Sequence, residues 1–129
     1  MALHTQGDID GALAEARYAI AAAPEFADAH SYLGSTLITR KGRFAEGLEA
    51  LAQAEAASPD DPTLQYTLGW CREFVAHRVS RRPHPGLDPD ELYRRAEQHL
   101  RRCLELKPDA KIRDDAKDLL ATIIKEDVE

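Results

Sequence analysis

Cysteine, aromatic residues and long apolar runs are all scarce in this sequence. Its 129 residues include two cysteines and one tryptophan, and aromatic side chains make up 6% of the chain. Two cysteines are too few for a disulfide scaffold, and no apolar run approaches the roughly 20 residues that a membrane-spanning helix needs. The basic start of a secretory signal is also missing, because Asp8, Asp10 and Glu15 precede the small residues at 19–24. We therefore expect a cytoplasmic protein without a membrane partner.

An excess of basic residues is missing as well. The chain holds 17 Lys and Arg against 23 Asp and Glu, which gives a net charge of −6. Surfaces that bind nucleic acids in general are basic, so we do not expect nucleic acid as the partner. Hydrophobic residues make up 43% of the chain, which suffices for one compact domain with a modest core.

A period of 35 residues runs through the sequence. The residues that match across one period are Leu33 and Leu68, Gly34 and Gly69, Gly7 and Gly42, Ala12 and Gly47, Leu13 and Leu48, Ala19 and Ala54, and Pro24 and Pro59. A shift of 49 carries Gly47, Leu51, Ala54 and Pro59 onto Ala96, Leu100, Cys103 and Pro108. One register therefore accounts for most of the chain if 14 extra residues are inserted once, and such a period indicates stacked repeats.

Each repeat has the pattern of a helix pair, because its large apolar residues recur at steps of three and four. Gly34 and Gly69 occupy the same position on the first helix of their repeats. A glycine inside a helix costs about 1 kcal/mol of helix stability relative to alanine. Because two repeats carry glycine at this same position, we infer that the second helix of the repeat lies too close there for a larger side chain. Ala12, Gly47 and Ala96 are the small residues expected opposite, on the second helices. Gly7 and Gly42 fall at turns, and each repeat closes at a proline, which ends a helix.

These features resemble the tetratricopeptide repeat, whose pattern is W-x-x-L-G-x-x-Y, then A-x-x-x-F, then a closing P. The resemblance covers nearly the whole chain and is weakest at the aromatic positions. There His30 and Gln65 replace Trp, Leu37 and Arg72 replace Tyr, and Ala16, Leu51 and Leu100 replace Phe. Arg72 either extends its charged end to solvent along its apolar stem or marks a local change of register. The resemblance implies an all-α solenoid of antiparallel helix hairpins, with about three repeats and a C-terminal capping helix.

The register divides the expected single domain, 1–129, into a partial repeat 1–26, a repeat 27–61, a repeat 62–110, and a capping helix with its tail, 111–129. We expect helices at 8–23, 25–39, 44–57, from 62 onward, from 89 onward and at 110–126. Asp61 and Asp88 are the expected N-caps of two of them, each followed by a proline, with Glu91 completing a capping box. The insertion, about 77–90, either lengthens both helices of its hairpin or forms a disordered loop, and we favour the longer helices.

The first repeat lacks its opening helix, so the chain either starts raggedly or is a piece of a longer protein, which is the reading we favour. A cut there would expose an alanine-rich face around Ala12, Ala16 and Ala19, where two copies could associate.

No catalytic motif is recognisable in the sequence. A nucleophile elbow, a phosphate-binding glycine loop and an HExxH helix are all missing. His99 and Cys103 are four residues apart and could hold a metal on one helical face. The repeat register turns Cys103 inward, however, and no second pair of ligands has a matching spacing. We therefore expect neither an enzyme nor a metal site, and no cofactor.

The resemblance also implies a binding site, because the first helix of each pair in this family lines a concave groove that binds peptides. The family's groove positions carried over to this sequence include Ser31, Ser35, Tyr66, Trp70 and Phe74. The three aromatic residues are spaced by four and so share one stripe of a helix; the alternative is that this stripe is core. The Lys and Asn residues with which one subfamily clamps acidic C-termini are absent, so we expect apolar anchors assisted by hydroxyl groups.

A second candidate surface is basic. Residues 72–108 hold 9 Lys and Arg against 6 Asp and Glu, whereas residues 1–71 hold 4 against 10. The arginines concerned are Arg78, Arg81, Arg82, Arg94 and Arg95. They are either a solvated helix face or a contact surface for an acidic partner or another copy of the chain.

The sequence therefore predicts a non-catalytic scaffold or adaptor, of bacterial type, that binds a partner peptide or helix in its groove. The alternative is a structural unit that self-assembles into a homo-oligomer through its open N-terminal end and the basic hairpin.

Overall fold

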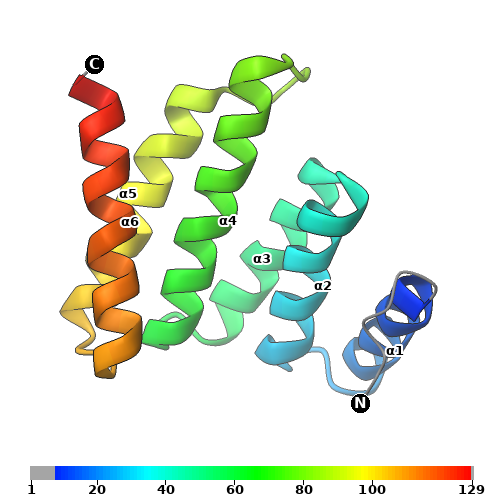
Figure 1. Cartoon of the computed structure of the whole chain (residues 1–129). Helices are drawn as coiled ribbons and strands as arrows, with labels where there is room; N and C mark the ends of the chain where they lie inside the picture. The colour runs from blue at the N-terminus through cyan, green and yellow to red at the C-terminus, as the bar shows by residue number, and fades with distance from the viewer. Residues whose placement is uncertain (1–7, 129) are drawn as a thin grey trace. The chain divides into compact units, whose positions relative to one another are not determined.

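The computed structural model describes residues 8–128, the last three of them by their backbone alone. This part of the chain forms six α-helices and no strand beyond one isolated bridge (Figure 1). The prediction of an all-α chain of helix hairpins with a final helix is confirmed. Residues 1–58 and 59–129 form two compact units. Gly7 lies outside the described residues, so its expected turn does too.

The first unit contains α1 (Ile9–Ala22), α2 (Ala27–Lys41) and α3 (Phe44–Ala57). Helix α2 ends at Gly42, whose φ of 67° is left-handed, as the expected turn requires. This one residue in the left-handed region reverses the chain, and α3 runs back beside α2 (Figure 1). Helix α1 contacts α2 through Ile9 and Leu13, which join a small apolar cluster around Leu37.

Helices α2 and α3 meet where both carry glycine. A Cβ atom added to Gly34 would lie 2.7 Å from the carbonyl oxygen of Gly47 and 2.7 Å from Cγ of Leu51. A Cβ atom added to Gly47 would lie 2.8 Å from the carbonyl oxygen of Gly34. The predicted reason for glycine inside these helices is therefore confirmed, because neither residue has room for a side chain.

The alanine-rich face of α1 is largely covered. Ala12 and Ala16 are buried and Ala19 is partly buried. Among residues 8–58, the large apolar residues that remain exposed are instead Tyr18 and Phe26, with 79% and 46% of their surface accessible. The expectation that these alanines form an open association surface is therefore wrong for two of the three.

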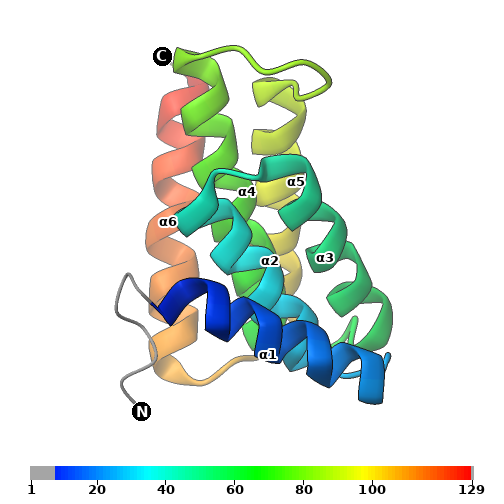
Figure 2. The same ribbon diagram turned by 90° about the vertical axis from the view of Figure 1, so that its right-hand side faces the viewer.

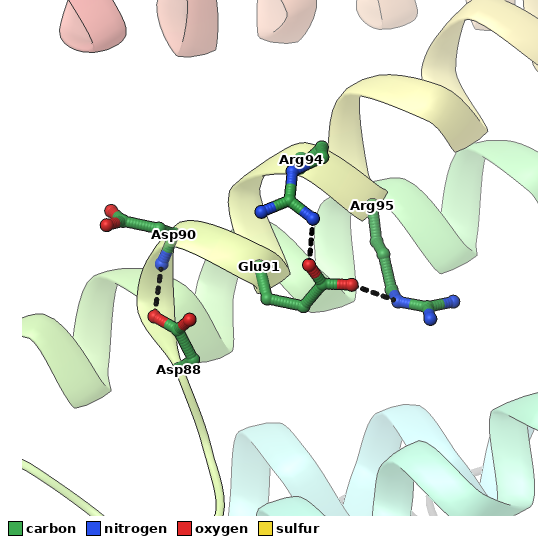
Figure 3. Close-up of polar contacts among 5 residues, drawn as sticks. All are labelled: Asp88, Asp90, Glu91, Arg94 and Arg95. Atoms are coloured by element: carbon green, nitrogen blue, oxygen red, sulfur yellow. Dashed lines mark hydrogen bonds and ion pairs between the residues drawn. The ribbon is translucent and has the colours of Figure 1, made fainter.

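The second unit contains α4 (Pro62–Arg81), α5 (Pro89–Glu105) and α6 (Ala110–Val128). Both predicted N-caps are confirmed. The carboxylate of Asp61 accepts a hydrogen bond from the backbone N–H of Thr63, and that of Asp88 accepts one from Asp90, each at 3.0 Å (Figure 3). Asp60 adds an ion pair at 2.7 Å to Arg102 at the far end of α5.

The capping box expected at Glu91 is not formed. Its two carboxylate oxygens accept from Arg94 and from Arg95 instead (Figure 3). Two charged partners three and four residues ahead on the same helix compete for the carboxylate. A charge-assisted bond to arginine is stronger than one to a neutral backbone N–H, which explains the outcome.

Both helices of the second hairpin reach into the insertion. Helix α4 continues to Arg81 and α5 begins at Pro89, so residues 82–88 make the connection (Figure 2). Within this loop Gly86 has a φ of 80°, and the N–H of Leu87 donates to the carbonyl of His84 at 3.2 Å. The second hairpin is thus longer than the first.

The core of the second unit forms where α5 packs against α4 and α6. A Cβ atom on Gly69 would lie 2.8 Å from Cγ of Leu100, so α4 and α5 approach as closely as the glycine in this register predicts. Around Leu100 lies a cluster of buried residues: Ala96, Cys103, Ala116, Leu120 and Ile123. Cys103 is therefore the buried thiol that the repeat register indicates.

Arg72 does not extend to solvent. The residue is 8% exposed, and its guanidinium donates to the backbone carbonyl of Leu68 at 3.4 Å. Helix α4, which carries Arg72, continues through this position without a break.

Candidate functional site

The aromatic stripe lies on α4, within the second unit. Successive helical residues are about 100° apart around the axis, so Trp70 points about 100° away from Gly69, whose side faces α5. Tyr66, Trp70 and Phe74 follow one another at steps of about 40°. All three side chains are partly buried, so each is anchored in the unit while part of its surface stays accessible.

Tyr66 is the most strongly attached of the three to the core. It packs against the cluster that α5 and α6 form around Leu100. Burial and the nearby carboxylate of Asp115 raise the pKa of its phenol. Asp115 itself accepts a hydrogen bond from Lys111 at 3.0 Å. The interpretation of the stripe as core therefore applies in part to Tyr66, and its role in binding stays a prediction.

Phe74 forms a cation–π pair with an arginine. The guanidinium carbon of Arg78 lies 4.6 Å from the centre of the Phe74 ring. Such a contact contributes about 0.5–1 kcal/mol at an exposed site and holds both side chains in place. The aromatic face of α4 thus continues directly into a basic one.

The hydroxyl groups predicted for the site lie on α2, in the first unit. Ser35 donates to the carbonyl of Tyr32 at 3.3 Å, and Thr39 donates to the carbonyl of Ser35 at 2.8 Å. These bonds use the donor hydrogens and leave the hydroxyl oxygens able to accept. Ser31 is partly buried, and no protein partner for its hydroxyl exists among residues 8–125.

The five arginines of the predicted basic surface differ in their surroundings. Arg94 and Arg95 are both tied to Glu91 (Figure 3). Arg78 covers Phe74, and Arg81 and Arg82 are exposed at the end of α4. Two of the five are therefore compensated within the protein, and the remaining three cluster at the C-terminal end of α4.

The two cysteines and His99 are used structurally. Burial raises the pKa of the Cys71 thiol to about 12 and raises that of Cys103 as well. Thiols with raised pKa values stay protonated at neutral pH and are poor nucleophiles. His99, the other half of the pair considered for metal binding, has its Nδ1 2.8 Å from Oε1 of the Gln65 side chain. In the described part of the chain, no three His, Cys, Asp or Glu residues gather in a metal-binding group.

Two residues next to the site were missed from the sequence. Lys111 and Asp115 lie on α6 beside Tyr66, yet α6 was read only as a cap. Extending the 49-residue shift would have carried Tyr66 onto Asp115 and Trp70 onto Leu119. The repeat register could therefore have predicted that α6 carries residues equivalent to those of the site. Helix α6 lacks, however, the Leu-Gly pair that marks the other first helices.

Known proteins share this pattern. Residues 1–62 match the family model described as tetratricopeptide repeat. The TPR repeat-containing protein PA4667 of Pseudomonas aeruginosa is 31% identical to the chain over 96 residues. That alignment covers 74% of this chain and 14% of the relative, so the chain corresponds to a small part of the relative's length. Across residues 8–128, no helix combines the length and the apolar character needed to cross a membrane.

Proposed function

Because this chain belongs to the tetratricopeptide repeat family, whose repeats generally serve as protein–protein interaction modules, we propose that it binds a segment of a partner protein along α4. The observation that carries the proposal is the pair Trp70 and Phe74, two partly buried rings on one face of that helix. Tryptophan and other large aromatic side chains dominate the binding energy of protein interfaces, because they bury much area with few rotatable bonds. The proposed role is that of a scaffold, without catalysis.

The surface around these rings is ordered before any partner arrives. Gly69 fixes the distance between α4 and α5, since Leu100 fills the space where a Cβ atom would lie. The Asp61 cap and the Asp60–Arg102 ion pair hold the ends of the same two helices. A preformed surface loses little conformational entropy on binding, so the burial of a partner's apolar side chains translates more fully into affinity.

Hydroxyl groups supply the polar part of the proposed contact. In the first unit, taken by itself, Ser31 and Ser35 on α2 have hydroxyl oxygens that can accept from backbone N–H groups, and their role in binding stays a prediction. Tyr66 adds a phenol whose ring is already packed on the core. We expect the phenol of Tyr66 to orient the partner, while Trp70 and Phe74 supply most of the affinity.

The proposal is tested by affinity capture with Trp70→Ala, Phe74→Ala and Tyr18→Ala beside the wild type. Tyr18 is the matched control, because it is an aromatic residue of α1 with 79% of its surface exposed. Proteins retained from the lysate of the source organism are quantified by mass spectrometry. Circular dichroism first establishes that all variants have the same helix content.

We expect at least one protein to be retained by the wild type and by Tyr18→Ala and lost by Trp70→Ala and Phe74→Ala. Equal retention by all four proteins contradicts the proposal. Retention of a tagged second copy of the chain itself, at a level set by protein concentration, would favour the self-assembling alternative.

A further inference from the structure

Arginines on the surface of the second unit fall into two groups. Five of them lie within 4.0 Å of a carboxylate: Arg94, Arg95, Arg101, Arg102 and Arg113. The other three exposed arginines are Arg78, Arg81 and Arg82, and none of them has a carboxylate partner among the residues whose side chains are described. The unit thus neutralises its surface arginines everywhere except at the end of α4.

These three arginines extend the aromatic face of the same helix. Arg81 follows Arg78 by three residues, so the two are neighbours on the helix surface, and Arg82 is the residue that directly follows the helix. At about 100° per residue, Trp70, Phe74, Arg78 and Arg81 fall within a sector of about 80°. A segment lying along Trp70 and Phe74 towards the end of α4 therefore meets these cations next.

We propose that the end of α4 is a subsite for carboxylates, and that the partner segment carries Asp or Glu beside the apolar side chains that cover Trp70 and Phe74. This inference rests on the proposed function and specifies its partner. The guanidinium of arginine matches a carboxylate with two parallel hydrogen bonds, and Arg81 and Arg82 offer two such groups without an internal competitor.

A short acidic segment of a protein suits this subsite better than a nucleic acid. The three arginines are a local group on a chain whose net charge is −6. Screening limits the reach of exposed charges to about 8 Å at physiological salt, so a short segment is attracted by the local group. A long polyanion extends beyond it and meets the excess of carboxylates on the rest of the chain.

The terminal position on α4 also explains why the cations are tolerated. Arg78 and Arg81 lie in the last turn, where the partial negative charge of the helix end favours cations. A role limited to this effect would be expressed in stability, whereas a subsite is expressed in binding. The two readings are therefore separated by measuring both quantities on the same variants.

The experiment compares Arg81→Gln/Arg82→Gln with Arg94→Gln/Arg95→Gln. Both variants remove two adjacent arginines from the same hairpin, but the second pair is already held by Glu91 (Figure 3). Each protein selects from a displayed library of short random peptides at low salt, and the selected peptides are sequenced. We expect the wild type and Arg94→Gln/Arg95→Gln to enrich Asp or Glu next to apolar residues, and Arg81→Gln/Arg82→Gln to enrich apolar residues alone.

An acidic peptide selected by the wild type is then measured by fluorescence anisotropy. We expect about five-fold weaker binding to Arg81→Gln/Arg82→Gln, since exposed ion pairs are individually weak, and a smaller difference at high salt. The variant Arg81→Lys/Arg82→Lys, which keeps both charges, should retain most of the acidic preference. Thermal unfolding midpoints should be the same for both glutamine variants.

Four results would overturn the inference. Selection of apolar peptides without acidic residues by the wild type would remove the subsite but leave the proposed function standing. Equal loss of acidic preference in both glutamine variants would show a general charge effect. Binding of a single-stranded oligonucleotide that depends on Arg81 and Arg82, without acidic peptides being selected, would point to nucleic acid instead. If the wild type selects no peptides at all, the proposed function fails together with the subsite.

Discussion

Replacement of Gly34 by alanine tests the close packing on which the first hairpin depends. The new Cβ atom would lie 2.7 Å from the carbonyl oxygen of Gly47 and 2.7 Å from Cγ of Leu51. Leu51 is fully buried and so has little space to rotate away, and the carbonyl belongs to the backbone of α3. The contact is relieved only if α2 and α3 move apart.

The expected loss of stability follows from two opposing effects. Alanine is favoured over glycine in a helix by about 1 kcal/mol. Overpacking a filled core costs about 1–3 kcal/mol, and a clash with backbone belongs at the upper end of that range. The net effect is a destabilisation of about 1–2 kcal/mol.

Gly11→Ala is the matched control. Gly11 lies in α1, and no atom within 4 Å would touch its new Cβ atom. It keeps the gain in helix propensity without the clash, so it should stabilise the protein by about 0.5–1 kcal/mol. In urea, with a slope of about 1–3 kcal/mol per M, the unfolding midpoints of the two variants should differ by about 1 M.

Unfolding is followed by far-ultraviolet circular dichroism, which reports the helices of both units. The fluorescence of Trp70, which lies in the second unit, shows whether the transition is shared. If Gly34→Ala is as stable as Gly11→Ala, the two helices do not approach each other as closely as the structure places them, and the packing reason for the glycine is refuted.

Two further predictions concern buried groups. Because burial raises the pKa of Cys71 from 9.0 to about 12, its thiol should resist alkylation in the folded protein and react after unfolding. As the pH rises above 9.0, the thiol ionises in the unfolded protein before it does in the folded one. The free energy of unfolding should therefore fall as the pH rises from 9.0 to about 12. Cys71→Val should reduce this fall with pH. His30→Gln should preserve stability, since Gln65 already makes the corresponding bond to Pro59. His30→Leu should cost about 1–3 kcal/mol in urea unfolding, because the carbonyl of Pro24 loses its donor.

The helix boundaries could be predicted wherever local chemistry decides them. Helix α3 begins and ends at the expected residues, Phe44 and Ala57, because it is built from strong helix formers. Helix α2 was expected at 25–39 but runs from Ala27 to Lys41. Its end is fixed by the left-handed Gly42, so the helix continues to the residue before it.

The site was less predictable than the helices because it depends on which neighbours compete. Spacing alone places Trp70 and Phe74 on one face of α4. It does not reveal that Tyr66 packs against the α5–α6 cluster, since that depends on side chains distant in sequence. The choice of Glu91 between the helix cap and two arginines is a balance of similar energies, which a pattern cannot resolve.

The two positions at which the family pattern has tryptophan show what the repeat requires of the residue at that position. His30 and Gln65 stand 35 residues apart where the family pattern has tryptophan. Each donates a side-chain hydrogen bond to the carbonyl of the proline six residues before it, at 2.8 Å to Pro24 and at 2.9 Å to Pro59. Both therefore tie the start of a first helix to the turn that precedes it.

Because both residues make this bond, we infer that the residue at this position has to fix the preceding turn. An indole ring is not needed for that. A tryptophan ring would fix the turn by packing against it. His30 and Gln65 instead fix it by donating a hydrogen bond to the carbonyl of the proline in the turn, which satisfies that carbonyl. His30 and Gln65 are 8% and 2% exposed, so the bonds are sheltered from competing water. Because each of these two turns is tied to its helix by such a bond, the sole tryptophan of the chain is not required at the turn. It lies instead on the face of α4 where we propose that the partner binds.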